Sequence, residues 1–230
     1  MNTRMIIRIL SLYSGHHSWT NHLVDTPDTK FVIVSIDNNE AYSHNTTLIK
    51  NMLDVSSYEI RQLFGGHNPD IILASPPCTT FSIASCGKHW NPPTEDGLRI
   101  PKSEEAETGL LLLDAVLSLI DVMKPKYYAI ENPRGLMRKM KQMDLYPRRT
   151  VWYCQYGETD GILRAKPTDI WTNAVWKPRP VCKNNNPDCN HIRAPRGAKT
   201  GTQGMKNNAM RSLIPTELTE EILADLLEEL

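Results

Sequence analysis

One cysteine of this chain stands where a reactive thiol could be held in place. It is Cys78, and it follows Pro76 and Pro77 at the end of the apolar run Asp70–Ser75. Two prolines restrict the backbone of this exit and so fix where the thiol projects. A thiol in such a place can act as a nucleophile when nearby groups lower its pKa, and a buried inert thiol is the alternative. The remaining cysteines lack this setting: Cys86, Cys154, Cys182 and Cys189.

A carboxylate follows the end of another apolar run. Glu131 comes after Tyr127–Ile130 and is followed by Asn132 and Pro133. Ligands of parallel sheets bind outside the carboxyl ends of the strands, so we expect Glu131 to share a crevice with Cys78. A thiolate beside a carboxylic acid suits addition to a conjugated ring, in which the acid protonates a ring nitrogen while the thiolate attacks. A surface glutamate without a role is the alternative.

A third strand end carries a residue suited to bind a nucleoside. Asp37 closes the run Phe31–Asp37, 22 residues after Gly15. A nucleotide-binding sheet places the acid for ribose hydroxyls at such a position. Because residues 16–18 are His-His-Ser, the glycine-rich turn that cradles a pyrophosphate is missing. The pattern predicts an adenosine ligand without phosphates, and an aspartate that only caps a helix is the alternative.

The elements that position these residues alternate between strands and helices over the first two-thirds of the chain. This alternation predicts an α/β fold with a doubly wound, mostly parallel sheet. We expect strands at Ile6–Tyr13, Phe31–Asp37, Asp70–Ser75 and Tyr127–Ile130, a short edge strand at 53–55, and an antiparallel pair at Thr150–Tyr156 and Pro167–Thr172. We expect helices at Glu40–Lys50, Ser103–Met123 and Thr216–Leu230.

Five segments of the chain occur in an order that is found in a known family. They are LSLYSG (Leu10–Gly15), SID (Ser35–Asp37), LASPPCTTFS (Leu73–Ser82), ENPRG (Glu131–Gly135) and LRAKPTDIWTN (Leu163–Asn173). With them the chain resembles the DNA cytosine-5 methyltransferases that use S-adenosylmethionine, in particular the compact phage-type members. Pro-Pro-Cys followed by Glu-Asn-Pro is specific to that family, because amino-methylating enzymes carry Pro-Pro-Tyr or Pro-Pro-Phe instead. The resemblance implies a class I methyltransferase fold, which is Rossmann-like.

The resemblance implies a catalytic role for four residues. Cys78 is similar in place to the nucleophile that adds to C6 of cytosine and so activates C5 for methyl transfer. Glu131 is similar to the acid that engages N3 and the exocyclic amine. Arg164 and Lys166 fall where the family has two arginines that hold the base and the glutamate, so Lys166 is a departure from the pattern.

The resemblance also implies binding positions. Asp37 would bind ribose hydroxyls, Asp54 the adenine amine, and Pro77 would back the cofactor. Ser82 would contact the DNA backbone, and Thr79, a second substrate position, stands where larger members usually have Gln. The implied cofactor positions together are Tyr13, Ser14, Gly15, Asp37, Asp54, Val55 and Pro77.

The resemblance implies three segments of the chain and double-stranded DNA as the binding partner. We expect an S-adenosylmethionine-binding catalytic domain at 1–173, a small basic target-recognition module at 174–208 and, at 209–230, a C-terminal helix that packs back on the catalytic domain. So small a module contacts few base edges, which predicts a short or relaxed target site in double-stranded DNA, with the cytosine flipped out of the stack. We expect a monomer without a membrane partner, a cytoplasmic setting in a bacterial or phage-infected host cell, and a link to restriction–modification.

Three alternatives stay open at this stage. An RNA cytosine-5 methyltransferase is one, since a branch of the same family acts on tRNA, and a catalytically silent DNA-binding relative is another. We expect no metal, but Cys182, Cys189 and His191 could be three zinc ligands for which the sequence offers no evident fourth.

The charge of the chain is balanced overall and unbalanced locally. The 230 residues hold 26 Lys and Arg against 26 Asp and Glu, and 40% are apolar, which is typical of a globular rather than a disordered protein. Arg134–Arg149 has six basic residues and one acid, and Lys177–Lys206 has seven and one. Pro215–Leu230 has six acids and no basic residue. Zero net charge therefore does not exclude a nucleic acid, and we expect the basic stretches to face phosphates and the acidic helix to face away.

Overall fold

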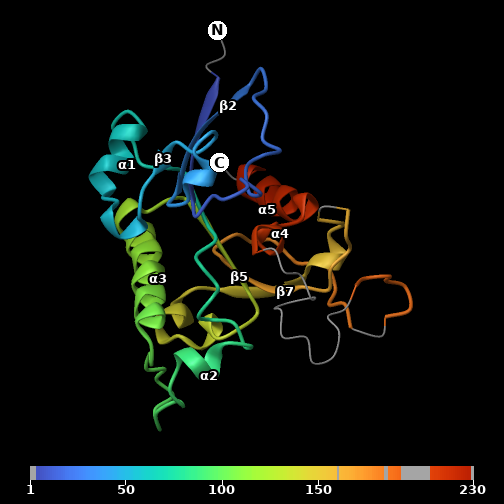
Figure 1. The fold of residues 1–230 in the computed structure, drawn as a ribbon. Helices are drawn as coiled ribbons and strands as arrows, with labels where there is room; N and C mark the ends of the chain where they lie inside the picture. Colours follow the sequence, from blue (N-terminus) through green and yellow to red (C-terminus); the bar gives the residue numbers. More distant parts are fainter. Residues whose placement is uncertain (1–3, 160, 184–185, 193–207, 229–230) are drawn as a thin grey trace.

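Seven strands form one sheet in the computed structural model, which describes residues 4–159, 161–183, 186–192 and 208–228 (Figure 1). The strand order is β3-β2-β1-β4-β5-β7-β6. The strands are β1 (Met5–Leu12), β2 (Thr29–Asp37), β3 (Leu48–Ile49), β4 (Ile71–Ala74), β5 (Tyr127–Pro133), β6 (Arg148–Trp152) and β7 (Pro167–Thr172). Strands β1 to β5 are parallel, and β7 runs antiparallel to both β5 and β6. This confirms the predicted doubly wound, Rossmann-like fold and its antiparallel final pair.

Helices cover both faces of the sheet. The α-helices are α1 (Ser57–Leu63), α2 (Cys86–His89), α3 (Glu104–Met123), α4 (Asn208–Ser212) and α5 (Thr216–Glu228). Short 3-10 helices are η1 (Glu40–Tyr42), η2 (Met52–Asp54), η3 (Met137–Lys139), η4 (Lys141–Leu145) and η5 (Tyr153–Gln155). Figure 1 shows α1 and α3 on one side of the sheet and α5 on the other. Among the helices that the structure describes, none is long and apolar enough to cross a membrane.

The long helix α3 begins and ends as its sequence dictates. The Ser103 hydroxyl accepts a hydrogen bond from the backbone of Ala106, and three glutamates occupy the first turn, where the helix dipole favours negative charge. Lys124 takes a left-handed conformation after the last turn, and Pro125 prevents continuation. The predicted helix at Ser103–Met123 is confirmed.

The central strands are buried on both faces, as parallel strands usually are. Leu10 and Leu12 of β1 pack in the layer with α3, and Ile7 and Ile9 pack in the layer with α5. Helix α5 buries a stripe of side chains at helical spacing, namely Leu218, Ile222, Leu223 and Leu226. The C-terminal helix is therefore part of the main core.

The edge of the sheet differs from the sequence prediction in two ways. The predicted helix over Glu40–Lys50 is wrong beyond η1, because Thr47 is hydrogen-bonded to Ser35 of β2. Its hydroxyl accepts from the Ser35 backbone N–H (3.1 Å), and the Ser35 hydroxyl accepts from the Thr47 backbone N–H (2.9 Å). Two threonines and two short polar residues also disfavour a helix there. The edge strand is β3, so the predicted strand at 53–55 is wrong as well: Asn51 caps a 3-10 turn instead.

The acidic helix and the basic stretch before it are joined rather than separate. The Arg179 guanidinium bonds Glu217 (2.7 Å) and Glu221 (2.6 Å) of α5. It also donates to the carbonyl of Gln155 (2.6 Å). Arg179, one of the basic residues of the stretch Lys177–Lys206, is thus paired with acidic residues of the protein itself.

Candidate active site

Cys78 lies on the loop that leaves the carboxyl end of β4. The neighbouring strand β5 runs parallel, with Ala74 beside Ile130, so the residues after the two strands emerge side by side. The buried Asn132 side chain donates to the carbonyl of Pro76 (2.9 Å) and holds this loop against the end of β5. Cys78 is exposed as a residue, although protein atoms crowd around its sulfur.

A second close contact joins the loops after β4 and β5. The backbone N–H of Leu136 donates to the carbonyl of Phe81 (2.6 Å). A Cβ at Gly135 would lie 2.3 Å from the same carbonyl oxygen, closer than packed atoms approach. Only glycine fits at this position, which gives the glycine of the ENPRG segment a structural reason.

Glu131 lies in β5, is 5% exposed and has two partners of its own. The Tyr153 hydroxyl donates to its Oε1 (2.8 Å), and the Lys166 ammonium lies 3.6 Å from the same oxygen. Lys166 also lies over the Tyr153 ring, 4.6 Å from the ring centre, and donates to the carbonyl of Arg211 (2.9 Å). This arrangement fixes the carboxylate in a buried pocket and gives it the partners that a buried charge requires.

The charges of this pocket act on the Cys78 thiol. Burial of the sulfur by its surroundings raises the pKa of Cys78, and the Glu131 carboxylate adds to the rise. The Lys166 ammonium is the main group that opposes it. The pKa of the Cys78 thiol therefore lies above its ordinary value, and Lys166 is the residue that favours the thiolate.

Arg164 comes two residues before Lys166 in the chain and points its guanidinium to the turn at Thr159. It is 3% exposed, and it donates to the carbonyl and the hydroxyl of Thr159. Its backbone pairs with the segment after β7, since the Ile192 N–H donates to the carbonyl of Leu163 (2.9 Å). Glu131 and Lys166 are thus in contact, and their charges act on Cys78, while the Arg164 guanidinium is bound by Thr159.

The two expected substrate positions follow Cys78 on its loop. Thr79 is exposed, and its carbonyl accepts from the Ser85 hydroxyl (2.7 Å). The half-buried Ser82 accepts from the backbone of Ala84 through its hydroxyl (3.3 Å). A pocket of about 350 Å³ opens between this loop and the first turns of α3, lined in part by Pro77, Thr79 and Thr80.

The expected cofactor residues of β1 and β2 meet at the carboxyl edge of the sheet. One oxygen of the Asp37 carboxylate accepts from the Gly15 backbone N–H (2.9 Å), and the other accepts from Asn39 (2.9 Å). Tyr13 and Gly15 both have positive φ, 54° and 45°, so the chain turns sharply between them. The Tyr13 hydroxyl donates to the carbonyl of Leu112 (3.1 Å), and burial raises the pKa of Tyr13.

This corner has the polar groups that a nucleoside would need. The Ser14 hydroxyl is buried, and among the described residues it has no hydrogen-bond partner. The Asp37 carboxylate is 8% exposed and keeps acceptor capacity beyond its two backbone bonds. A ligand with neighbouring hydroxyls and an amine fits such donors and acceptors, so the residues present fit an adenosine-containing cofactor.

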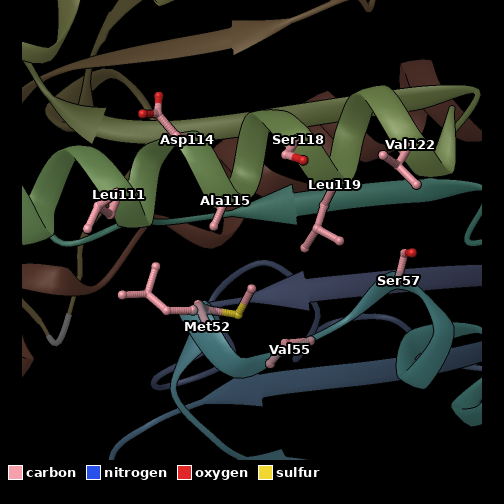
Figure 2. A pocket seen from close by; sticks show the side chains of 10 residues that line it. Met52, Val55, Ser57, Leu111, Asp114, Ala115, Ser118, Leu119 and Val122 are labelled. Atoms are coloured by element: carbon pink, nitrogen blue, oxygen red, sulfur yellow. The ribbon is translucent and has the colours of Figure 1, made fainter.

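Asp54 and Val55 lie further along the same edge, at and after η2. The Asp54 side chain is exposed, whereas Val55 lines a groove of about 390 Å³ between η2 and α3. Figure 2 shows this groove, with Met52 and Val55 on one side and Ala115 and Leu119 of α3 on the other. Neither Cys78 nor Glu131 lines it, so it is separate from the thiol and carboxylate.

Sequence reasoning missed two residues that contact the pocket. Tyr153 follows β6 and reaches Glu131 across β7, and Asn132 holds the Pro76 loop. Asn132 could have been found, because it lies within the ENPRG segment. Tyr153 carried no sequence signal, since its role depends on how the antiparallel pair β6–β7 folds against β5.

Comparison with known proteins identifies related chains. The model of a family described as C-5 cytosine-specific DNA methylase matches residues 8–147. A protein of frog virus 3 (isolate Goorha), named as a probable DNA (cytosine-5)-methyltransferase, is 26% identical over 228 residues, which is 94% of this chain and 99% of that protein.

Two solved structures are similar at a lower level. The Entamoeba histolytica methyltransferase EhMeth is 15% identical with a TM-score of 0.47 over 74% of this chain and 53% of its own. A mutant of Spodoptera frugiperda DNMT2 is 22% identical with a TM-score of 0.44 over 78% of this chain and 56% of its own. The chain spans little more than half the length of these two proteins.

Proposed function

The chain belongs to the C-5 cytosine-specific DNA methylase family, and from this premise we propose that it methylates C5 of cytosine in double-stranded DNA through a covalent bond between Cys78 and C6. The family and the viral relative make it a DNA (cytosine-5-)-methyltransferase. One observation carries the mechanism: the Cys78 loop lies beside a buried Glu131 whose carboxylate is held by Tyr153 and Lys166. A thiol and a fixed carboxyl group in one crevice suit addition to a pyrimidine.

The proposed steps start with the thiol. Cys78 loses its proton to solvent, and its sulfur forms a bond to C6 while the electron pair of the C5–C6 double bond moves towards C5. Glu131, protonated when the base enters, donates its proton to N3 as the sulfur adds and so neutralises the charge that develops on the ring, and its other oxygen accepts a hydrogen bond from the exocyclic amine. After C5 has gained the methyl group, it loses its proton to water. The sulfur–C6 bond then breaks, the ring double bond is restored, N3 returns its proton to Glu131 and Cys78 leaves as the thiolate.

Three further residues would support these two. Lys166 favours the thiolate of Cys78 and neutralises Glu131, although the family pattern has an arginine there. Tyr153 orients the Glu131 carboxylate through its hydrogen bond and is a positioning residue. Arg164 would hold the base from the turn at Thr159, while Thr79 and Ser82 contact the DNA.

S-adenosylmethionine would bind at the corner formed by Asp37, Ser14 and Gly15, and when bound it supplies the methyl group. Asp37 would accept hydrogen bonds from ribose hydroxyls. The buried Ser14 hydroxyl offers a donor and acceptor that no described residue uses. Tyr13, Asp54, Val55 and Pro77 complete the set of residues proposed for this cofactor.

Base flipping and a small recognition module complete the proposal. Cys78 can reach C6 only in an unstacked cytosine, so the base must leave the duplex. Residues 174–208 would form the recognition module on a catalytic domain at 1–173, and 193–207 lie outside the described residues. The basic stretch after Glu131 would contact phosphates, although the guanidinium of Arg138 is engaged by Asp169. We propose that the protein acts as a monomer on a short or relaxed target.

Covalent trapping tests the mechanism. In duplex DNA that contains 5-fluorocytosine, fluorine replaces the hydrogen that must leave C5 as a proton. The sulfur–C6 adduct should therefore persist in denaturing gels when S-adenosylmethionine is added. Cys78→Ala should abolish the adduct and the methyl transfer, and the matched control Cys86→Ala should keep both. Glu131→Gln should slow transfer by roughly 10²–10⁴-fold. Full transfer by Cys78→Ala would refute the covalent route.

Substrate comparison tests the choice of nucleic acid. Tritiated methyl transfer to duplex DNA should exceed transfer to tRNA, and the reverse result would favour the RNA enzyme. Failure to transfer to either, in a protein that binds DNA, would favour the silent relative. Bisulfite sequencing of DNA from expressing cells should show methylation at a short site, and a target of five or more defined bases would contradict the small recognition module.

A further inference from the structure

A second cluster of reactive side chains lies beside the active site and is not used by the proposed mechanism. Cys154 in η5 meets Cys182, Cys189 and His191 of the segment after β7, and their sulfur and nitrogen atoms all lie within 4.8 Å of one another. The His191 Nδ1 is 3.2 Å from the Cys189 sulfur and 3.6 Å from the Cys182 sulfur.

These separations suit a tetrahedral metal ion. Bonds of about 2.3 Å from zinc to sulfur and 2.0–2.1 Å to nitrogen place neighbouring ligand atoms roughly 3.5–3.8 Å apart. Three thiols and one imidazole are among the donor sets of structural zinc sites, and four protein ligands leave no position open for chemistry. We propose that Cys154, Cys182, Cys189 and His191 bind one structural zinc ion.

The surroundings of the cluster support this assignment. Cys154, Cys182 and His191 are buried and Cys189 is half-buried, so the ion would be shielded from solvent. The Asn186 side chain donates to the Cys182 sulfur (3.6 Å), the kind of outer hydrogen bond that holds a thiolate ligand. All of these cysteines are free thiols in the structure, so no disulfide competes for them.

The position of the cluster gives the ion a consequence for the active site. Cys154 follows Tyr153, whose hydroxyl bonds Glu131, and His191 precedes Ile192, which pairs with the chain at Arg164. An ion bound here would link the segment after β7 to the two loops that hold Tyr153 and Arg164. Metal binding by the cluster stands on its own geometry, and only this effect on the active site rests on the proposed function.

Metal analysis of the purified full chain, prepared without chelators, tests the site. We expect inductively coupled plasma mass spectrometry to find one zinc ion per chain. Cys154→Ser and Cys189→Ser should each lose most of the zinc, while the control Cys86→Ser should keep it, because the Cys86 thiol lies outside the cluster and donates to the carbonyl of Ile83 (3.2 Å). His191→Cys should retain zinc in a four-sulfur set, whereas His191→Ala should lose it.

A second measurement keeps the test valid if a variant fails to fold. The wild-type protein, unfolded with a chelator and refolded with Co²⁺, should show thiolate-to-cobalt absorption and the visible bands of a tetrahedral site. Metal-free wild-type protein in which all five thiols react with a thiol reagent would overturn the proposal, as would a disulfide within the cluster or iron in place of zinc. Zinc content is read without any methyl transfer, so either proposal can fail while the other stands.

Discussion

Replacement of Lys166 by methionine tests whether the buried charge pair organises the active site. Both side chains of the pair are only 6% exposed, and the Lys166 ammonium lies 3.6 Å from the nearer oxygen of Glu131. Methionine keeps much of the apolar length of lysine but removes the charge. The variant leaves a buried carboxylate whose remaining partner is the Tyr153 hydroxyl at 2.8 Å.

The size of the effect follows from the geometry. Two unit charges at this separation attract by about 5 kcal/mol when the effective dielectric constant is near 20. The desolvation cost of the ammonium, which the variant no longer carries, offsets part of this loss. The hydrogen bond from Lys166 to the carbonyl of Arg211 (2.9 Å) adds about 1 kcal/mol. Loss of one partner of a buried pair typically costs roughly 3–5 kcal/mol, and we expect Lys166→Met to fall in this range.

Urea unfolding followed by tryptophan fluorescence measures this cost. A compensating variant makes the test specific: Glu131→Gln removes the stranded charge but keeps an oxygen for the Tyr153 hydroxyl. We expect the Glu131→Gln/Lys166→Met double variant to be at least about 2 kcal/mol more stable than Lys166→Met. A loss below about 1 kcal/mol in the single variant, or a double variant that is no more stable, would refute the reasoning.

The same variant reports on the thiol. Because the Lys166 ammonium lowers the pKa of Cys78, its loss should raise that pKa and move alkylation of Cys78 by iodoacetamide to higher pH. Peptide mass spectrometry separates Cys78 from the other cysteines. Lys141→Met removes an exposed lysine that pairs with Asp96 and should leave the profile unchanged. Coincident profiles for both variants would contradict the electrostatic role of Lys166.

Three further predictions follow from other contacts. Gly135→Ala should destabilise the fold by about 1–3 kcal/mol and lower methyl transfer, because its Cβ would lie 2.3 Å from the Phe81 carbonyl oxygen. Urea unfolding measures this loss, and a variant as stable as the wild type would refute the clash. Asp37→Asn should weaken the binding of S-adenosylhomocysteine at least about tenfold, since a carboxylate accepts hydrogen bonds more strongly than an amide. Calorimetry measures this affinity, and an unchanged value would mean that the cofactor does not bind at Asp37. Burial raises the pKa of Tyr156 to about 12. Above pH 10 the unfolded chain therefore loses this proton before the folded one does, so stability should fall between pH 10 and 12, and less steeply in Tyr156→Phe.

The fold could be predicted largely because its signals are local. Buried parallel strands such as β2 are nearly continuous apolar runs, and α3 carries its own cap and stop in Ser103 and Pro125. The sheet edge could not be predicted, because the choice between helix and strand at Thr47 is made by hydrogen bonds to Ser35, a residue of another element. Propensity is weak at such positions, and tertiary contacts decide.

The candidate site divides in the same way. Strand ends bring Cys78 and Glu131 to one edge because parallel strands share a direction, so their proximity could be expected from their positions. Tyr153 could not be expected, because it lies in η5, after β6, and reaches Glu131 across β7. Cys154 was missed for a related reason: 27 residues separate it from Cys182, a spacing that matches no compact metal motif.

The short segment between β7 and α4 explains why a metal would be useful there. The predicted module at 174–208 has 35 residues, and chains below about 40 residues seldom bury enough apolar surface to fold without a metal, disulfide or partner. Trp176 already packs in the layer of α5, and Arg179 pairs with that helix, so the start of the module belongs to the main core. Its continuation at 186–192 has exposed apolar side chains such as Ile192 and reaches the catalytic sheet through its pairing at Arg164 and through the cysteine and histidine side chains. Zinc at that junction would supply the stability that so short a segment lacks, beside the chain at Arg164 that we propose holds the base.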